Sequence, residues 1–194
     1  MVVSVSRGDQ IDLADADPEL NDLLVGLGWD ASDEKGQEID LDASIFMLGP
    51  GNRVRSSADI IFYNQMESEC GSITLSQDNR TGVGDGDDEF LNVNLSMIPE
   101  DVQKLAIAVS IYEAEEREQN FGMVSASFVR LVNTQTNKEI ARYDLREESS
   151  TETAFVFGEI LRSGENKWSF RALGRGFSGE LRFLCDLFGV TVED

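Results

Sequence analysis

Residues 91–113 read LNVNLSMIPEDVQKLAIAVSIYE and decide the fold class. In the first part, Leu91, Val93 and Leu95 share one face of an extended chain while polar residues share the other, which predicts a half-buried strand. In residues 104–113, branched apolar side chains alternate with small ones, which predicts a strand packed on both faces at the centre of a sheet. The proline that opens the segment between the two strands predicts one short helical turn there.

Short apolar runs of the same kind recur along the chain, separated by Gly, Asn, Asp or Ser. Together they predict an all-β protein of about ten strands, at the spacing typical of a sandwich or barrel. The further strands are expected at residues 23–29, 43–48, 60–64, 72–76, 124–133, 139–145, 153–161 and 168–174.

Helix is scarce in this pattern. Leu181, Leu184 and Phe188 recur at intervals of three and four residues, so we expect a short C-terminal helix over residues 178–188. A further helical turn is expected over residues 15–22, which contain Asp-Pro.

Length and charge limit the function classes. The chain has 194 residues with no Pro-rich or Ser/Gly-rich linker, so we expect a single domain over residues 1–194. Its 37 acidic and 16 basic residues give a net charge of −21, which repels phosphate backbones and anionic lipid headgroups. We therefore expect no nucleic-acid partner.

The start of the chain lacks the basic and apolar regions of a secretory signal, and no window approaches the roughly 18 apolar residues of a membrane span. A cytoplasmic location is expected. Histidine is absent, which removes the usual general base, the Ser-His-Asp triad and the imidazole metal ligand. We expect no catalytic residues and no zinc, copper or non-haem iron site.

Acidic residues are most concentrated in residues 78–89, DNRTGVGDGDDE, where five acids and three glycines occupy twelve residues between two expected strands. Carboxylates about 6 Å apart repel by roughly 3 kcal/mol per pair at an effective dielectric near 20, so a cation would stabilise this loop. Calcium suits it because Ca²⁺ accepts about six to eight oxygen ligands in flexible geometry. The spacing is not that of an EF-hand, since Val83 stands where glycine is required. A solvated acidic turn is the alternative interpretation.

A second acidic cluster spans residues 30–42 and holds six acids and one lysine. Asp40 and Asp42 flank Leu41, so an extended chain turns both carboxylates to one side and the leucine to the core. We expect these two aspartates to bind metal. For Asp33, Glu34 and Glu38 a solvated hairpin loop is the favoured interpretation.

Several segments resemble, in order and over nearly the whole chain, the successive motifs of the TerD family of tellurium-resistance and stress-response proteins. They are VGLGWD (25–30), DLDAS (40–44), FYN (62–64), the acidic loop 78–89, SIYEA (110–114), FG (121–122), IARYDL (140–145) and TETAFVFGE (151–159). The resemblance implies a two-sheet β-sandwich, calcium binding at clustered acidic loops, and a role in resistance to tellurite and other stresses.

The resemblance also implies a set of calcium ligands. They are Asp78, Asn79, Thr81, Gly84, Asp85, Asp87, Asp88 and Glu89 from the acidic loop, Asp40 and Asp42 from the Asp-Leu-Asp motif, and Asp30 and Asn64, which end two other motifs. The family usually has Asp where Glu113 stands, so no ligand role is assigned to Glu113.

We expect a metal-dependent binding or scaffold module with other proteins of a stress-response complex as partners; the inner face of a membrane is a location the resemblance leaves open. A direct tellurite site is not expected, because the domain is strongly negative and its two cysteines, Cys70 and Cys185, are far apart in the chain. Two alternatives stay open: a hydrolase that uses paired carboxylates, such as Asp87 and Asp88 or Asp40 and Asp42, and a passive calcium buffer.

Overall fold

The described residues form twelve β-strands and a few short helices. The structure, a computed structural model, describes residues 3–30, 39–76, 86–124, 126–144, 151–164 and 167–190. The strands are β1 (Val3–Ser4), β2 (Gln10–Asp12), β3 (Asp22–Trp29), β4 (Leu41–Leu48), β5 (Ile60–Ile61), β6 (Ile73–Leu75), β7 (Glu89–Asn94), β8 (Lys104–Ile111), β9 (Ser127–Asn133), β10 (Lys138–Asp144), β11 (Ala154–Gly164) and β12 (Lys167–Phe177). The helices are α1 (Leu13–Ala16), α2 (Glu180–Phe188) and the 3₁₀ turns η1 (Ser57–Asp59), η2 (Leu95–Met97) and η3 (Phe121–Met123).

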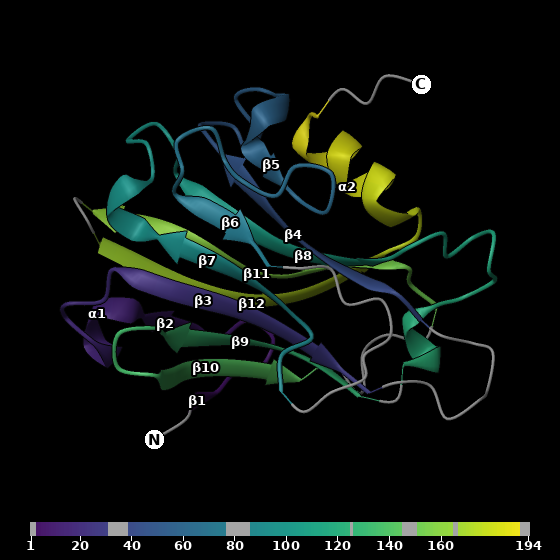
Figure 1. Ribbon diagram of the computed structural model, residues 1–194, viewed down its shortest axis with the longest axis horizontal. Coiled ribbons are helices and arrows are strands. Elements are labelled where there is room, and N and C mark those ends of the chain that lie inside the picture. The colour runs from purple at the N-terminus through teal and green to yellow at the C-terminus, as the bar shows by residue number, and fades with distance from the viewer. Residues whose placement is uncertain are drawn as a thin grey trace.

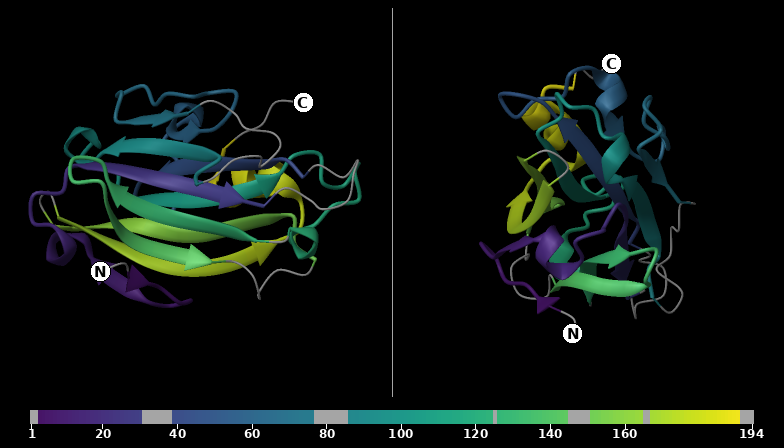
Figure 2. Two further views of the ribbon diagram at one scale, coloured as in Figure 1. Left: turned by 60° about the horizontal axis from the view of Figure 1, so that its bottom comes forward. Right: turned by 90° about the vertical axis from the view of Figure 1, so that its left-hand side faces the viewer.

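Two six-stranded sheets pack face to face as a β-sandwich (Figures 1 and 2). One has the order β1-β10-β9-β3-β7-β6 and the other the order β2-β12-β11-β8-β4-β5; we call them the β3 sheet and the β8 sheet. Neighbouring strands are antiparallel except β1 and β10, which run parallel. The expected fold class and the two-sheet sandwich are confirmed.

Strand β8 is buried on both faces, as its alternation predicts. Leu105, Ile107 and Val109 pack in the main core between the sheets, while Ala106 and Ala108 face a second, smaller core under α2. The small alanines let the helix approach the sheet closely, and branched side chains fill the wider space between the sheets. The β8 sheet is therefore covered on both sides.

Helix α2 confirms the expected C-terminal helix. It begins after Gly179, at φ 120°, and ends at Gly189, whose left-handed backbone at φ 79° closes the helix with hydrogen bonds from its N–H to the carbonyls of Cys185 and Asp186. Figure 2 shows α2 (yellow) on the outer side of the sandwich. Among the described residues, no helix has the length and apolar character needed to cross a membrane.

The chain forms two strands that the sequence pattern does not predict, β1 and β2. They are two and three residues long, too short for an alternating pattern to show, and they pair only with β10 and β12. The first helical segment also differs, since α1 begins at Leu13, where the Asp12 side chain accepts a hydrogen bond from the N–H of Ala14. It ends before Pro18, because a residue that precedes proline disfavours the helical conformation.

Candidate functional site

The described parts of the two acidic segments, residues 30, 39–42 and 86–89, lie at one end of the sandwich. Strand β7 begins beside the end of β3, because Glu89 pairs with Leu27 and the N–H of Asp88 donates to the carbonyl of Leu27 at 2.8 Å. Strand β4 also begins at this end, where Leu41 lies opposite the last residue of β8, Ile111. Figure 1 shows the arrowhead of β3 and the start of β4 toward the same side of the molecule.

Trp29 connects the two segments directly. Its backbone N–H donates to Oδ2 of Asp88 at 2.9 Å, and its indole Nε1 donates to the carbonyl of Ile39 at 3.2 Å, next to Asp40. The indole ring is buried. Burial, together with the nearby negative charges of Asp87 and Asp30, raises the pKa of Asp88, although the hydrogen bond from Trp29 opposes this. The negative charges of Asp87 and Asp30 therefore act on the carboxyl group of Asp88.

Glu89 joins the two sheets. The residue is 1% exposed, and its Oε2 accepts a hydrogen bond from the N–H of Ala43 at 2.8 Å. Ala43 lies on β4, in the opposite sheet, beyond the two residues of that strand that pair with β5. The carboxylate thus satisfies a buried backbone donor that the short β5 does not reach.

Asp87 points away from this end, across the outer face of the β3 sheet. Its two oxygens accept hydrogen bonds from Nε and Nη2 of Arg130 at 2.8 and 2.9 Å. Arg130 also contacts Glu139 at 3.1 Å, and these carboxylates raise its pKa. A cation at Asp87 would have to share oxygens that the guanidinium already occupies.

Asp40 and Asp42 stand at the start of β4, as expected, with Leu41 in the main core between them. Both residues are buried, at 7% and 5% exposed. The carbonyl of Asp40 accepts a hydrogen bond from the N–H of Tyr112 at 2.9 Å. Asp42 lies opposite Ser110 on the face of the sheet that is turned toward α2.

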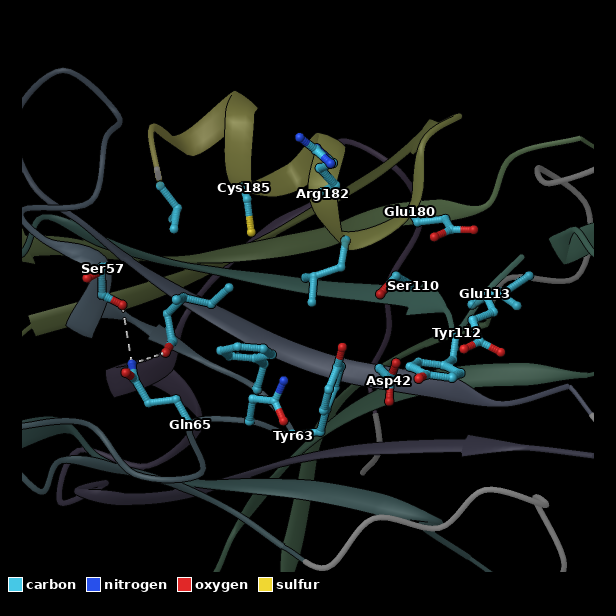
Figure 3. Close-up of a pocket in the computed structure, with 16 residues that line it drawn as sticks. Asp42, Ser57, Tyr63, Gln65, Ser110, Tyr112, Glu113, Glu180, Arg182 and Cys185 are labelled. Atoms are coloured by element: carbon cyan, nitrogen blue, oxygen red, sulfur yellow. Dashed lines mark hydrogen bonds between the residues drawn. The ribbon is translucent and has the colours of Figure 1, made fainter. Parts of the chain in front are cut away.

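Asp42 and Asn64 line the same pocket, which has a volume of about 510 Å³ and lies between the β8 sheet and α2 (Figure 3). Burial and the charge of Asp42 raise the pKa of Tyr63, and a hydrogen bond to Glu113 raises the pKa of Tyr112. Both tyrosines therefore keep their hydroxyl protons at neutral pH.

Five of the expected ligands, Asp78, Asn79, Thr81, Gly84 and Asp85, lie outside the described residues. Asp30 is described and exposed, and its N–H donates to the carbonyl of Ala126 at 2.9 Å. Within the described ranges, no three Asp, Glu, Cys or His side chains are grouped closely enough to hold a metal ion. Trp29 connects Asp88 to Ile39, the residue before Asp40, and Asp30 follows Trp29 in the chain. Asp42, Asn64 and Asp87 lie in other surroundings.

The sequence pattern did not indicate the roles of Trp29 and Arg130. One feature of the sequence does point to the Asp87–Arg130 pair. Gly26 is a glycine inside a strand, and such a glycine often marks a position where another group approaches the backbone closely. A Cβ at this position would lie 2.4 Å from Cγ of Asp87, so only glycine lets the aspartate cross the strand to reach Arg130.

Comparison with known proteins identifies tellurium-resistance and stress proteins as relatives. A family model described as the TerD domain matches residues 1–188. The tellurium resistance protein TerD of Serratia marcescens is 48% identical over 193 residues and covers 100% of both chains. General stress protein 16U of Bacillus subtilis (strain 168) is 44% identical over 193 residues, covering 99% of this chain and 100% of its own.

A solved structure with the same fold is that of a homologue of telluride resistance protein (TerD) from Streptomyces coelicolor A3(2). It superposes with a TM-score of 0.72 at 22% identity, covering 85% of this chain and 95% of that one. At this identity the likeness concerns the fold alone.

Proposed function

The chain belongs to the TerD family, whose members include proteins of tellurium resistance and general stress, and from this we propose that it is a calcium-binding stress-response protein acting as a metal-dependent binding module. The observation that carries the proposal is the link through Trp29, which joins Asp88 to the residue before Asp40. Two acidic segments far apart in the sequence thereby border one end of the sandwich.

The chemistry of the groups at this end fits calcium. Asp30, Asp40 and Asp88 offer oxygen atoms only, and the chain has no histidine. Hard divalent cations prefer oxygen ligands, and calcium tolerates the irregular geometry of loop carboxylates and carbonyls better than magnesium does. A bound ion would supply the positive charge that offsets repulsion among these acids. We propose that the other acidic-loop residues expected as ligands complete the site.

The positions of Asp87 and Asp88 do not favour a hydrolase that uses this pair of carboxylates. Asp87 and Asp88 are bound to different partners, Arg130 on β9 and the backbone of Trp29 on β3. A general acid and a general base must face one substrate between them. We therefore propose that metal occupancy creates a surface for other proteins of a stress-response complex, in the cytoplasm and without a direct tellurite site.

Calcium titration by calorimetry tests the proposal. Calcium is expected to bind wild-type protein and to raise its Tm, by about 2.7 kcal/mol of added stability at a free concentration one hundred times Kd. Asp88→Asn should weaken binding by roughly tenfold or more, because it removes one ligand charge while keeping an oxygen for the N–H of Trp29.

The matched control is Asp101→Asn. Asp101 is an exposed aspartate that pairs with Arg55. It precedes the start of β8, whereas the proposed site lies at the end of the sandwich where β8 finishes at Ile111. Its substitution lowers the net negative charge equally but should leave calcium affinity unchanged. Identical melting curves with calcium and with excess chelator would refute the proposal, and equal losses in both variants would assign binding to bulk charge.

A further inference from the structure

The pocket between α2 and the β8 sheet has the size and chemistry of a small-molecule site. Its volume of about 510 Å³ is in the range of pockets that enclose small ligands. Its walls come from distant parts of the chain: β4 and the end of β8 on one side, the segment after η1 below, and α2 above (Figure 3).

One end of the pocket is acidic. Asp42, Glu113 and Glu180 line it together with a single basic residue, Arg182. Figure 3 shows the three carboxylates toward the same side of the pocket, with Ser110 beside them. Two of the three carboxylates are held in place by other contacts. Glu113 is paired with Arg117 at 3.1 Å, and Glu180 accepts a hydrogen bond from the N–H of Glu115 at 2.7 Å.

Aromatic rings lie next to these acids. Tyr63 and Tyr112 meet edge to face with their centroids 5.9 Å apart, and Phe62 packs against Tyr63 at 5.1 Å. Asp42 lies close to both tyrosines (Figure 3), since its charge contributes to the raised pKa of each. A carboxylate beside aromatic rings is an arrangement that attracts an ammonium or guanidinium group through charge and through the ring faces.

Between the acids and the polar Ser57 and Gln65 at the other end, part of the wall is apolar (Figure 3). Leu181 and Cys185 from α2 and Ile60 from β5 line it and belong to the small core under the helix. Burial raises the pKa of the Cys185 thiol to about 11, so this wall carries no charge from cysteine at neutral pH. The pocket thus combines an acidic end with an apolar stretch of wall beside it.

We propose that this pocket binds a small organic cation, with its ammonium or guanidinium group among Asp42, Glu113 and the tyrosine rings and its apolar body against Leu181 and Cys185. Anionic ligands are excluded by the excess of carboxylates. A hard divalent ion binds oxygen ligands and would gain no stabilisation from the aromatic and apolar walls. These walls favour a larger cation that also buries carbon.

Calorimetric titration with three probes of one shape tests the charge requirement: 2-phenylethylamine, which is cationic, 2-phenylethanol, which is neutral, and phenylacetate, which is anionic. Calcium is kept at a fixed concentration throughout, so that this result is independent of whether calcium itself binds. The amine should bind with one site per chain. The alcohol should bind more weakly by roughly tenfold or more, and the acid should not bind. Equal binding of amine and alcohol would overturn the proposal.

Two matched pairs of variants locate the site. Leu181→Trp fills the pocket and should abolish amine binding, whereas Leu187→Trp places the same ring on the exposed side of the same helix and should not. Glu113→Gln, at the pocket, should weaken the amine roughly fivefold, while Glu116→Gln, exposed nearby, should not.

The Glu113 pair keeps the test valid if the larger tryptophan prevents folding. Unchanged amine affinity in Glu113→Gln would overturn the proposal. So would equal losses in Glu113→Gln and Glu116→Gln, because the amine would then follow the overall negative charge of the protein.

Discussion

The carboxylate of Asp87 lies across strand β3 at Gly26 and accepts two hydrogen bonds from Arg130, at 2.8 and 2.9 Å. Gly26 and Arg130 are directly paired across β3 and β9, so the aspartate crosses one strand to reach the next. The side chain of Asp87 is only 9% exposed. This ion pair therefore holds the segment just before β7 against the face of the sheet.

Gly26→Ala should destabilise the protein by about 1–3 kcal/mol, because its Cβ would come within 2.4 Å of Asp87 Cγ and displace the carboxylate from Arg130. Urea unfolding measures the change. Gly164→Ala, near the end of β11, is the control, since a Cβ there has ordinary contacts at 3.7 Å with Lys167. If both substitutions had the same small effect, the close approach of Asp87 would not matter for stability.

Glu89→Leu should cost about 1.5–3 kcal/mol of unfolding free energy, because it leaves the buried N–H of Ala43 without its acceptor. Unfolding is measured with chelator present, so that loss of a bound ion cannot contribute. Glu89→Gln keeps an acceptor oxygen and should cost less than Glu89→Leu. Equal costs for both would contradict a role for the hydrogen bond between the sheets.

Much of the fold could be predicted from the alternation of apolar residues and from the turn-forming residues between the strands. The central position of β8 follows from the alanines between its branched residues, and α2 follows from apolar residues at helical spacing. The strand expected over residues 91–96 ends earlier, at Asn94, because the side chain of Asn94 accepts a hydrogen bond from the N–H of Met97 and starts η2. Such capping depends on one side chain and is invisible to a two-residue period.

The candidate site was less predictable, because its organisation depends on contacts between residues far apart in the chain. Spacing alone indicates that Asp42 turns away from the core that holds Leu41, and the structure agrees. Spacing cannot indicate that Asp87 pairs with Arg130, or that Glu89 reaches Ala43, since these partners are 43 and 46 residues away. Their pairing becomes evident only when the strand register is known.

The two cysteines should differ in reactivity. Burial opposes ionisation of Cys70, but hydrogen bonds with Ser72 and Ser68 outweigh it and lower the pKa of this thiol. Burial raises the pKa of Cys185 to about 11, and Asp186 adds to the effect. Below this value Cys185 stays a thiol, so iodoacetamide at pH 8 should label Cys70 first, as read by peptide mass spectrometry. Faster labelling of Cys185 would show that α2 opens readily from the sheet.

Calcium should change hydrogen exchange locally. The amides of Trp29, Asp88 and Tyr112 donate to Asp88, Leu27 and Asp40, at the end of the sandwich where the acidic segments meet. Repulsion among the acids should favour opening there without metal, whereas the cores on both sides of β8 hold that strand in either state. Mass spectrometry should therefore show calcium-dependent protection at these three amides and unchanged protection at Ile107 and Val109. Loss of protection at Ile107 and Val109 after chelation would mean that burial alone does not hold the sandwich together, and that calcium is a required part of the fold.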